Sequence, residues 1–138
     1  MNSTVDSTQA RKDAIEVEPL RIIIMTAVAL GLNLLALWIG TAAGASLVIS
    51  APEPINAITV AVATAVPLLV MGAVVRVLAR RFPLRRLAGW VGLIFAIASS
   101  VGSFIAAADT MTALMLATMH FIAGFAWFIA LRSWVKPS

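Results

Sequence analysis

Polar residues occur at one depth in four separate apolar segments of the sequence. Each lies 12 or 13 positions from the arginine that bounds its segment: Asn33 from Arg21, Thr64 from Arg76, Ser99 from Arg86, and His120 from Arg132. In helical segments, a rise of 1.5 Å per residue places all four roughly 18 Å from the charged end, near the middle of a bilayer core about 30 Å thick. The spacing therefore predicts one polar layer, made of Asn33, Thr64, Ser99, Ser100 and His120.

Two interpretations of this layer stay open from the sequence. An unpaired donor is costly in hydrocarbon, so Asn33 and His120 are expected to face inward and to bond to each other, to a serine or to water. The layer is then either a hydrogen-bonded clamp that fixes helix register or a site that binds a ligand or handles protons, with His120 as the side chain that ionises near neutral pH. Pro67 cannot donate to the Ala63 carbonyl and so supplies one more acceptor at this depth.

Asp109 is expected on the same helical face as His120, at the outer end. The two residues are 11 positions apart. At about 100° and 1.5 Å per residue, they share a face and lie about 16 Å apart along the helix, too far to form an acid–base pair. Asp109 is therefore predicted either to mark the outer mouth of a polar path or to be an exposed acid at a turn.

The sequence offers few groups for metal, cofactor or covalent chemistry. It contains no cysteine and one histidine, and no glutamate falls inside an apolar segment, so a metal or haem site lacks ligands. The P-loop, GxGxxG, GxSxG and HExxH motifs do not occur. The sequence thus predicts a protein that is not an enzyme and holds no cofactor.

Composition determines the class of protein that must position these residues. Of 138 residues, 62% are hydrophobic and 12% are charged, and the mean hydropathy is +1.02, far from the balance of soluble domains. Four apolar segments are long enough for membrane helices, and none alternates with the period of two that a β-barrel requires. The sequence predicts an all-α, four-helix transmembrane bundle of up-down topology, with spans at about 21–46, 55–79, 87–107 and 111–132.

Basic residues divide the connections into two groups. All ten lie at or before the start of the first segment, from the end of the second segment to the start of the third, or at or after the end of the fourth. The other two connections carry only Glu53 and Asp109 as charged residues. The positive-inside rule then places both termini in the cytoplasm of a multi-pass protein of the cell membrane. The polar residues 1–19 are predicted to form a flexible cytoplasmic tail ahead of a membrane domain at 20–136.

The cytoplasmic boundary is expected to attract anionic lipids of the bilayer. This expectation rests on the four arginines Arg80, Arg81, Arg85 and Arg86. The amphipathic rings of Trp90, Trp127 and Trp134 are expected at the same interface. Because the basic residues flank apolar segments and form no basic soluble domain, nucleic acid is not an expected partner.

Small residues at four-residue spacing indicate close helix packing. In a bilayer, helices approach through such residues because hydrophobic burial gives little drive for association. Gly40 and Gly44 form a GxxxG pair, and the third segment carries the series Ala88, Gly92, Ala96 and Ser100. These residues are expected either to pack within one bundle or, for Gly40 and Gly44, to face another subunit of a homo-oligomer or a larger membrane complex.

Several of these residues also carry a family resemblance. They are Asn33, Leu34 and Leu35 in the first segment, Gly44 after it, Pro67, Leu68, Leu69 and Gly72 in the second, and Asp109, Met119 and His120 at the fourth. With them, the chain after its tail resembles the small actinobacterial membrane proteins classed as domain of unknown function 6069. The resemblance implies four membrane helices and brings no established activity or catalytic residue.

Two functional hypotheses follow from the sequence. The first is a small, non-catalytic scaffold or accessory subunit that packs against itself or against a larger membrane assembly. The second is a carrier or sensor for a small ligand or a proton, which uses the polar layer. A cavity that reaches His120 favours the second hypothesis, and closely packed side chains around His120 favour the first.

Overall fold

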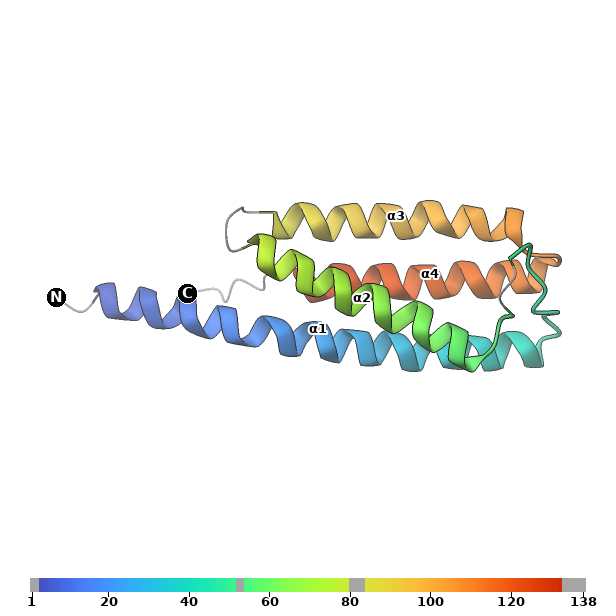
Figure 1. Cartoon of the computed structure of the whole chain (residues 1–138), viewed down its shortest axis with the longest axis horizontal. Helices are drawn as coiled ribbons and strands as arrows, with labels where there is room; N and C mark the ends of the chain where they lie inside the picture. Colours follow the sequence, from blue (N-terminus) through green and yellow to red (C-terminus); the bar gives the residue numbers. More distant parts are fainter. Residues whose placement is uncertain (1–2, 52–53, 80–83, 133–138) are drawn as a thin grey trace.

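A computed structural model of the protein contains four α-helices over the residues that it describes (Figure 1). The helices are α1 (Ser3–Ala42), α2 (Ala57–Ala79), α3 (Arg85–Ala106) and α4 (Thr110–Leu131). The structure describes residues 3–51, 54–79 and 84–132, with side chains from residue 19 onward. The all-α fold class predicted from the sequence is thereby confirmed.

Each helix contains a stretch that is long and apolar enough to cross a membrane. These stretches are Pro19–Ala42, Ala57–Leu78, Arg85–Ala106 and Thr110–Leu131, with 22 to 24 residues each. At 1.5 Å per residue, they match a hydrocarbon core about 30 Å thick. At most 44% of the residues in each apolar window are buried inside the protein, so much of every helix surface is apolar and suited to lipid.

Helix α1 extends well before its membrane stretch, which differs from the flexible tail predicted for residues 1–19. Its backbone is helical from Ser3, and in Figure 1 this part projects past the other helices. Pro19 lies inside α1 and removes one backbone donor without ending the helix. The segment is poor in apolar residues but contains Ala, Glu, Lys, Arg and Gln, which favour helix. Low hydrophobicity argues against a packed segment, but it does not argue against a helix.

The sequence predicts a first span up to residue 46, whereas α1 ends at Ala42 because Gly44 caps it. Gly44 has a φ of +93°, in the left-handed region that favours glycine. Its N–H donates to the Thr41 carbonyl (3.1 Å), and the Ala45 N–H donates to the Gly40 carbonyl (2.9 Å), as in a Schellman cap. Gly44 therefore lies beyond the helix and is not the second half of a helix-packing pair.

Gly40 packs inside the bundle. It is buried, and a Cβ atom at this position would lie 2.5 Å from the Sδ atom of Met115 in α4. The interpretation of Gly40 and Gly44 as a face for another subunit is therefore wrong, since one glycine faces α4 and the other ends α1.

Helix α4 lies at the centre of the packing. It contacts α1 and α3 extensively, and α1 also packs against α2. By contrast, α2 meets α3 and α4 at only a few residues, although α2 and α3 follow one another in the chain. At the α1–α2 contact, a Cβ atom at Gly72 would lie 2.7 Å from Cγ2 of Ile22. The predicted bundle is confirmed, and α2 is held in it chiefly by α1.

The small residues of α3 form its contact with α4. A Cβ atom at Gly92 would lie 2.2 Å from the Trp127 ring, and one at Gly124 would lie 2.5 Å from the Cβ atom of Ala96. A real Cβ atom cannot lie this close to another side chain, so α3 and α4 can approach this closely only because both positions are glycine. The small-residue series of the third segment therefore packs within the bundle.

Trp127 is buried, which corrects its predicted place at the membrane interface. Only 7% of the residue is exposed, and its Nε1–H donates to the Ala88 carbonyl at 2.8 Å. Gly92 leaves the space that the ring occupies. Trp90, near the start of α3, is 46% exposed, and Trp134 lies outside the described residues.

Gly92→Ala should weaken the α3–α4 contact, because the added methyl group overlaps the rigid Trp127 ring. Overpacking of this kind lowers the free energy of unfolding by about 1–3 kcal/mol. Gly102→Ala in the same helix is the matched control, since a Cβ atom there meets nothing within 4 Å. In thermal unfolding of the purified protein in detergent, Gly92→Ala should melt below wild type and Gly102→Ala should not. Equal melting temperatures of the two variants would contradict the close contact between Gly92 and the Trp127 ring.

Candidate functional site

The first part of the predicted polar layer joins α1 to α2. Asn33 Nδ2 donates to Thr64 Oγ1 at 2.9 Å, and both side chains are buried. This bond replaces the predicted one from Asn33 to His120 or to a serine. A donor and an acceptor are thereby satisfied at a depth where water is scarce.

The serines of the layer belong to a different contact, between α3 and α4. The Ser100 hydroxyl donates to the Ala96 carbonyl one turn earlier (2.9 Å) and lies 3.4 Å from the Ala117 carbonyl of α4. A helical serine commonly satisfies its hydroxyl in this way. Ser99 is half-buried beside it. Although the sequence predicts the serines at the same depth as Asn33, Ser100 bonds within the α3–α4 contact and Asn33 bonds to Thr64 of α2.

His120 is half-buried on α4 and bonds to its own helix. Its ring Nδ1 lies 2.8 Å from the Leu116 carbonyl oxygen. A carbonyl only accepts, so Nδ1 carries the proton in this bond, and Nε2 of the neutral ring is an acceptor. Within the described part of the chain, no three His, Asp or Glu side chains lie close enough to hold a metal ion.

A cavity of about 240 Å³ connects Asn33 and His120 with the α1–α2 connection. Its mainly apolar wall consists of Asn33, Thr59, Val60, Ala63, Leu116, Met119, His120 and Ala123 of the helices and Ile49, Pro54 and Ile55 of the connection. Asn33 Oδ1 is the buried side-chain oxygen that has no hydrogen-bond partner among the described residues. Leaving such an acceptor unpaired costs about 1–3 kcal/mol. The cavity thus combines two residues of the predicted layer with an unused acceptor.

Asp109 caps α4 and is absent from the described wall of that cavity. Its carboxylate accepts from the Thr112 N–H (2.8 Å), the Thr112 hydroxyl (2.6 Å), the Ser46 N–H (3.2 Å) and the Ser46 hydroxyl. The hydroxyls of Ser46 and Thr112 hold the pKa of the Asp109 carboxyl well below its usual range, because they stabilise the ionised form. The structure thus shows Asp109 as a helix cap that also binds the α1–α2 connection, and its predicted role as an outer mouth stays a prediction.

The Asp109 cap belongs to a wider network between two connections. The Leu47 N–H donates to Thr112 Oγ1 at 3.1 Å, and Thr112 is fully buried. The Ser50 N–H donates to the Ala106 carbonyl at 2.9 Å. Sequence reasoning missed Ser46 and Thr112. The Asp109-to-Thr112 spacing is an N-cap signal, but nothing local indicates Ser46.

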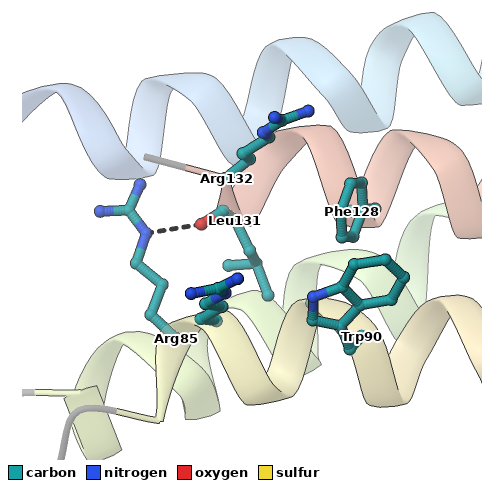
Figure 2. A pocket seen from close by; sticks show the side chains of 7 residues that line it. Arg85, Trp90, Phe128, Leu131 and Arg132 are labelled. Atoms are coloured by element: carbon teal, nitrogen blue, oxygen red, sulfur yellow. Dashed lines mark hydrogen bonds between the residues drawn. The ribbon is translucent and has the colours of Figure 1, made fainter. Parts of the chain in front are cut away.

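A second cavity, of about 680 Å³, lies between α3 and α4 at the opposite end of the bundle (Figure 2). Its wall consists of Arg85, Arg86, Gly89 and Trp90 of α3 with Phe128, Leu131 and Arg132 at the end of α4. Two of the predicted lipid-contact residues, Arg85 and Arg86, are among them, whereas Arg80 and Arg81 lie outside the described residues. Sequence reasoning used Arg132 only for topology and missed its place here.

Two arginines satisfy the last carbonyls of α4. Arg85 Nε donates to the Leu131 carbonyl at 2.8 Å, as the dashed line in Figure 2 shows. Arg21 Nη1 of α1 donates to the Arg132 carbonyl. The final carbonyls of a helix have no partner within it, and cations favour that end. These bonds therefore join α1 and α3 to the end of α4.

The Asp109 network should make stability depend on acid pH. The folded-state pKa is depressed, so the network stabilises the fold above the unfolded value of about 3.9 and loses that contribution as pH falls through the folded value. Asp109→Asn keeps a capping acceptor but removes the charge. The variant should melt below wild type at pH 7 and lose less stability between about pH 4 and pH 2. Thermal unfolding in detergent at several pH values tests this, and identical pH profiles would contradict it.

Comparison with known proteins places the chain in a family. Residues 9–136 match the family described as "Family of unknown function (DUF6069)", which covers all four membrane stretches. No curated protein and no solved structure gives a significant match. Since the match spans most of the sequence, the resemblance seen in its residues is confirmed, and the chain belongs to the DUF6069 family, whose function is unknown.

Proposed function

We propose that the protein is a non-catalytic membrane protein that binds a small, largely apolar molecule with a hydrogen-bond donor, as a carrier or sensor. The observation that carries this proposal is that Asn33, which lines the 240 Å³ cavity, has a buried Oδ1 with no hydrogen-bond partner among the described residues. A fold that leaves a buried acceptor unpaired gains from a ligand that donates to it.

The other groups on the cavity wall support this type of ligand. His120 contributes a ring that bonds to Leu116 through Nδ1, which leaves Nε2 to interact with a donor. Pro67 inside α2 cannot donate to the Ala63 carbonyl, so Ala63 brings a further acceptor to this region. A mainly apolar wall with a few converging polar groups is the usual form of a small-molecule site.

The accessory-subunit role is the second candidate. Helix α2 supports it, because α2 has few contacts with α3 and α4 and exposes large apolar side chains such as Ile58, which is 75% exposed. Lipid also covers such a surface, and the packing of Gly40 inside the bundle removes the feature that pointed to a second subunit. The ligand-binding role has the more specific support.

The orientation is part of the same proposal. In an up-down bundle of the cell membrane with both termini in the cytoplasm, the 240 Å³ cavity begins on the outer side and the arginine-lined cavity lies on the inner side. The distribution of the basic residues supports this arrangement.

Single cysteines test the orientation, since the chain has none of its own. Ala51→Cys in the α1–α2 connection should react with an impermeant maleimide added to sealed cells. Ser138→Cys at the carboxyl terminus should react only after the membrane is opened. Reaction of Ser138→Cys in sealed cells would overturn the orientation and leave ligand binding to be tested separately.

The single histidine provides a direct reporter of ligand binding. Purified protein with isotope-labelled histidine is titrated with 1-butanol, which donates a hydrogen bond, and with methyl propyl ether, its isomer that does not. The alcohol should shift the His120 ring resonances in a saturable way and bind more tightly than the ether. Asn33→Leu should weaken alcohol binding roughly 2- to 10-fold, the equivalent of one neutral hydrogen bond.

Thr118→Leu is the control for this titration, because Thr118 is exposed on α4 and bonds only to its own helix. It should bind the alcohol as wild type does. A shift that rises linearly with both compounds and is unchanged by Asn33→Leu would show simple partition into the membrane. That result would contradict a ligand site at Asn33 and His120.

A further inference from the structure

The 680 Å³ cavity combines a charged end with an aromatic end. Arg85 and Arg86 begin α3, and Arg132 follows α4, so their charges gather where the membrane stretches of both helices stop. Trp90 and Phe128 lie one turn further into these stretches (Figure 2). Aromatic rings at this level are typical of the boundary between hydrocarbon and headgroups.

The exposed arginines of the charged end have no carboxylate partner among the described side chains. Arg86 and Arg132 are exposed, and no acidic partner is seen for either among the described side chains. Within those side chains, the only carboxylate is Asp109, which is held by Ser46 and Thr112 at the other end of the bundle. The like charges of Arg86 and Arg132 give this surface a positive potential that attracts an anion.

Backbone groups at the cavity strengthen this preference. The carbonyls of Leu131 and Arg132, which give the end of α4 its negative character, already accept from Arg85 and Arg21. Leu84, the N-cap of α3, makes no side-chain capping bond. The first N–H groups of α3 therefore add positive potential beside the arginines.

The aromatic end distinguishes a lipid from a free anion. The Trp90 and Phe128 rings meet edge to face with centroids 4.9 Å apart, and Trp90 is 46% exposed. Inorganic phosphate would use only the arginines, and the cavity is far larger than that ion needs. An anionic phospholipid matches both ends, since its phosphate is charged and its glycerol and upper acyl carbons are apolar enough to lie against the rings.

We infer that this cavity binds the phosphate group of one anionic phospholipid, with Arg86 and Arg132 as its charge partners and the Trp90–Phe128 pair beside its glycerol region. Arg85 holds the end of α4 in place and so positions the site. This lipid site is separate from the cavity at Asn33 and His120, and neither depends on the other.

The test uses the full chain in nanodiscs of phosphatidylcholine with a minor share of phosphatidylglycerol. After transfer to mild detergent, native mass spectrometry counts the lipids that each protein retains. Wild type should retain one phosphatidylglycerol in preference to phosphatidylcholine. Arg86→Gln and Arg132→Gln should each lower that retention about tenfold or more, as expected for loss of a charge-assisted hydrogen bond.

Arg76→Gln is the matched control, because it removes the same charge from the last turn of α2, outside the cavity. It should retain the anionic lipid as wild type does, and Arg86→Lys should retain it better than Arg86→Gln. The substituted arginines of the cavity are exposed, so each variant should keep its helices, and circular dichroism checks this.

Three results would overturn the inference. Equal loss in Arg76→Gln would show general attraction of anionic lipid to a basic surface. Equal retention of phosphatidylcholine would remove the need for negative charge. Displacement of the bound lipid by millimolar glycerol 3-phosphate would identify a soluble phosphate compound as the occupant.

Discussion

Hydrogen-bonding groups in a bilayer core have no water to bond to, and the packing of this protein follows from that constraint. The Trp127 N–H reaches the Ala88 carbonyl, and the Asn33 amide reaches Thr64. At the helix ends, Asp109 accepts the first-turn N–H of Thr112, while arginines donate to the last carbonyls of α4. Against this background, the unpaired Asn33 Oδ1 stands out among the described side chains, and Asn33 is one of the residues that line the 240 Å³ cavity.

Composition and spacing predicted the features that depend on position along one helix. Four apolar segments became four helices able to span a membrane, since length and hydropathy are local properties. Residue counting also placed Asn33 and Thr64 at one depth, and they are bonded. Counting from the charged end measures height in the membrane but not direction around the helix axis. Ser100, at a similar predicted depth, therefore bonds within the α3–α4 contact instead.

The remaining features depend on contacts between distant parts of the chain. Asp109 looked like an exposed acid because its partner Ser46 is 63 residues away. Gly44 fitted a packing motif because the pattern does not reveal whether a helix continues through it, and its positive φ shows that the helix has ended. In the sequence, Arg132 is only one of the basic residues that predict the orientation. It lies beside Arg85 and Arg86 because α4 packs against α3, a contact that the sequence does not reveal.

The uneven packing of α2 leaves one side of the 240 Å³ cavity with fewer contacts to the bundle than the others. Helices α1, α3 and α4 are joined by extensive contacts, by the Asp109 network at one end and by arginine bonds at the other. Helix α2, by contrast, is tied mainly to α1 and supplies Thr59, Val60 and Ala63 to the cavity wall. A tilt of α2 about its contact with α1 would break few contacts with α3 and α4, so α2 is the wall of the cavity that the rest of the bundle holds least.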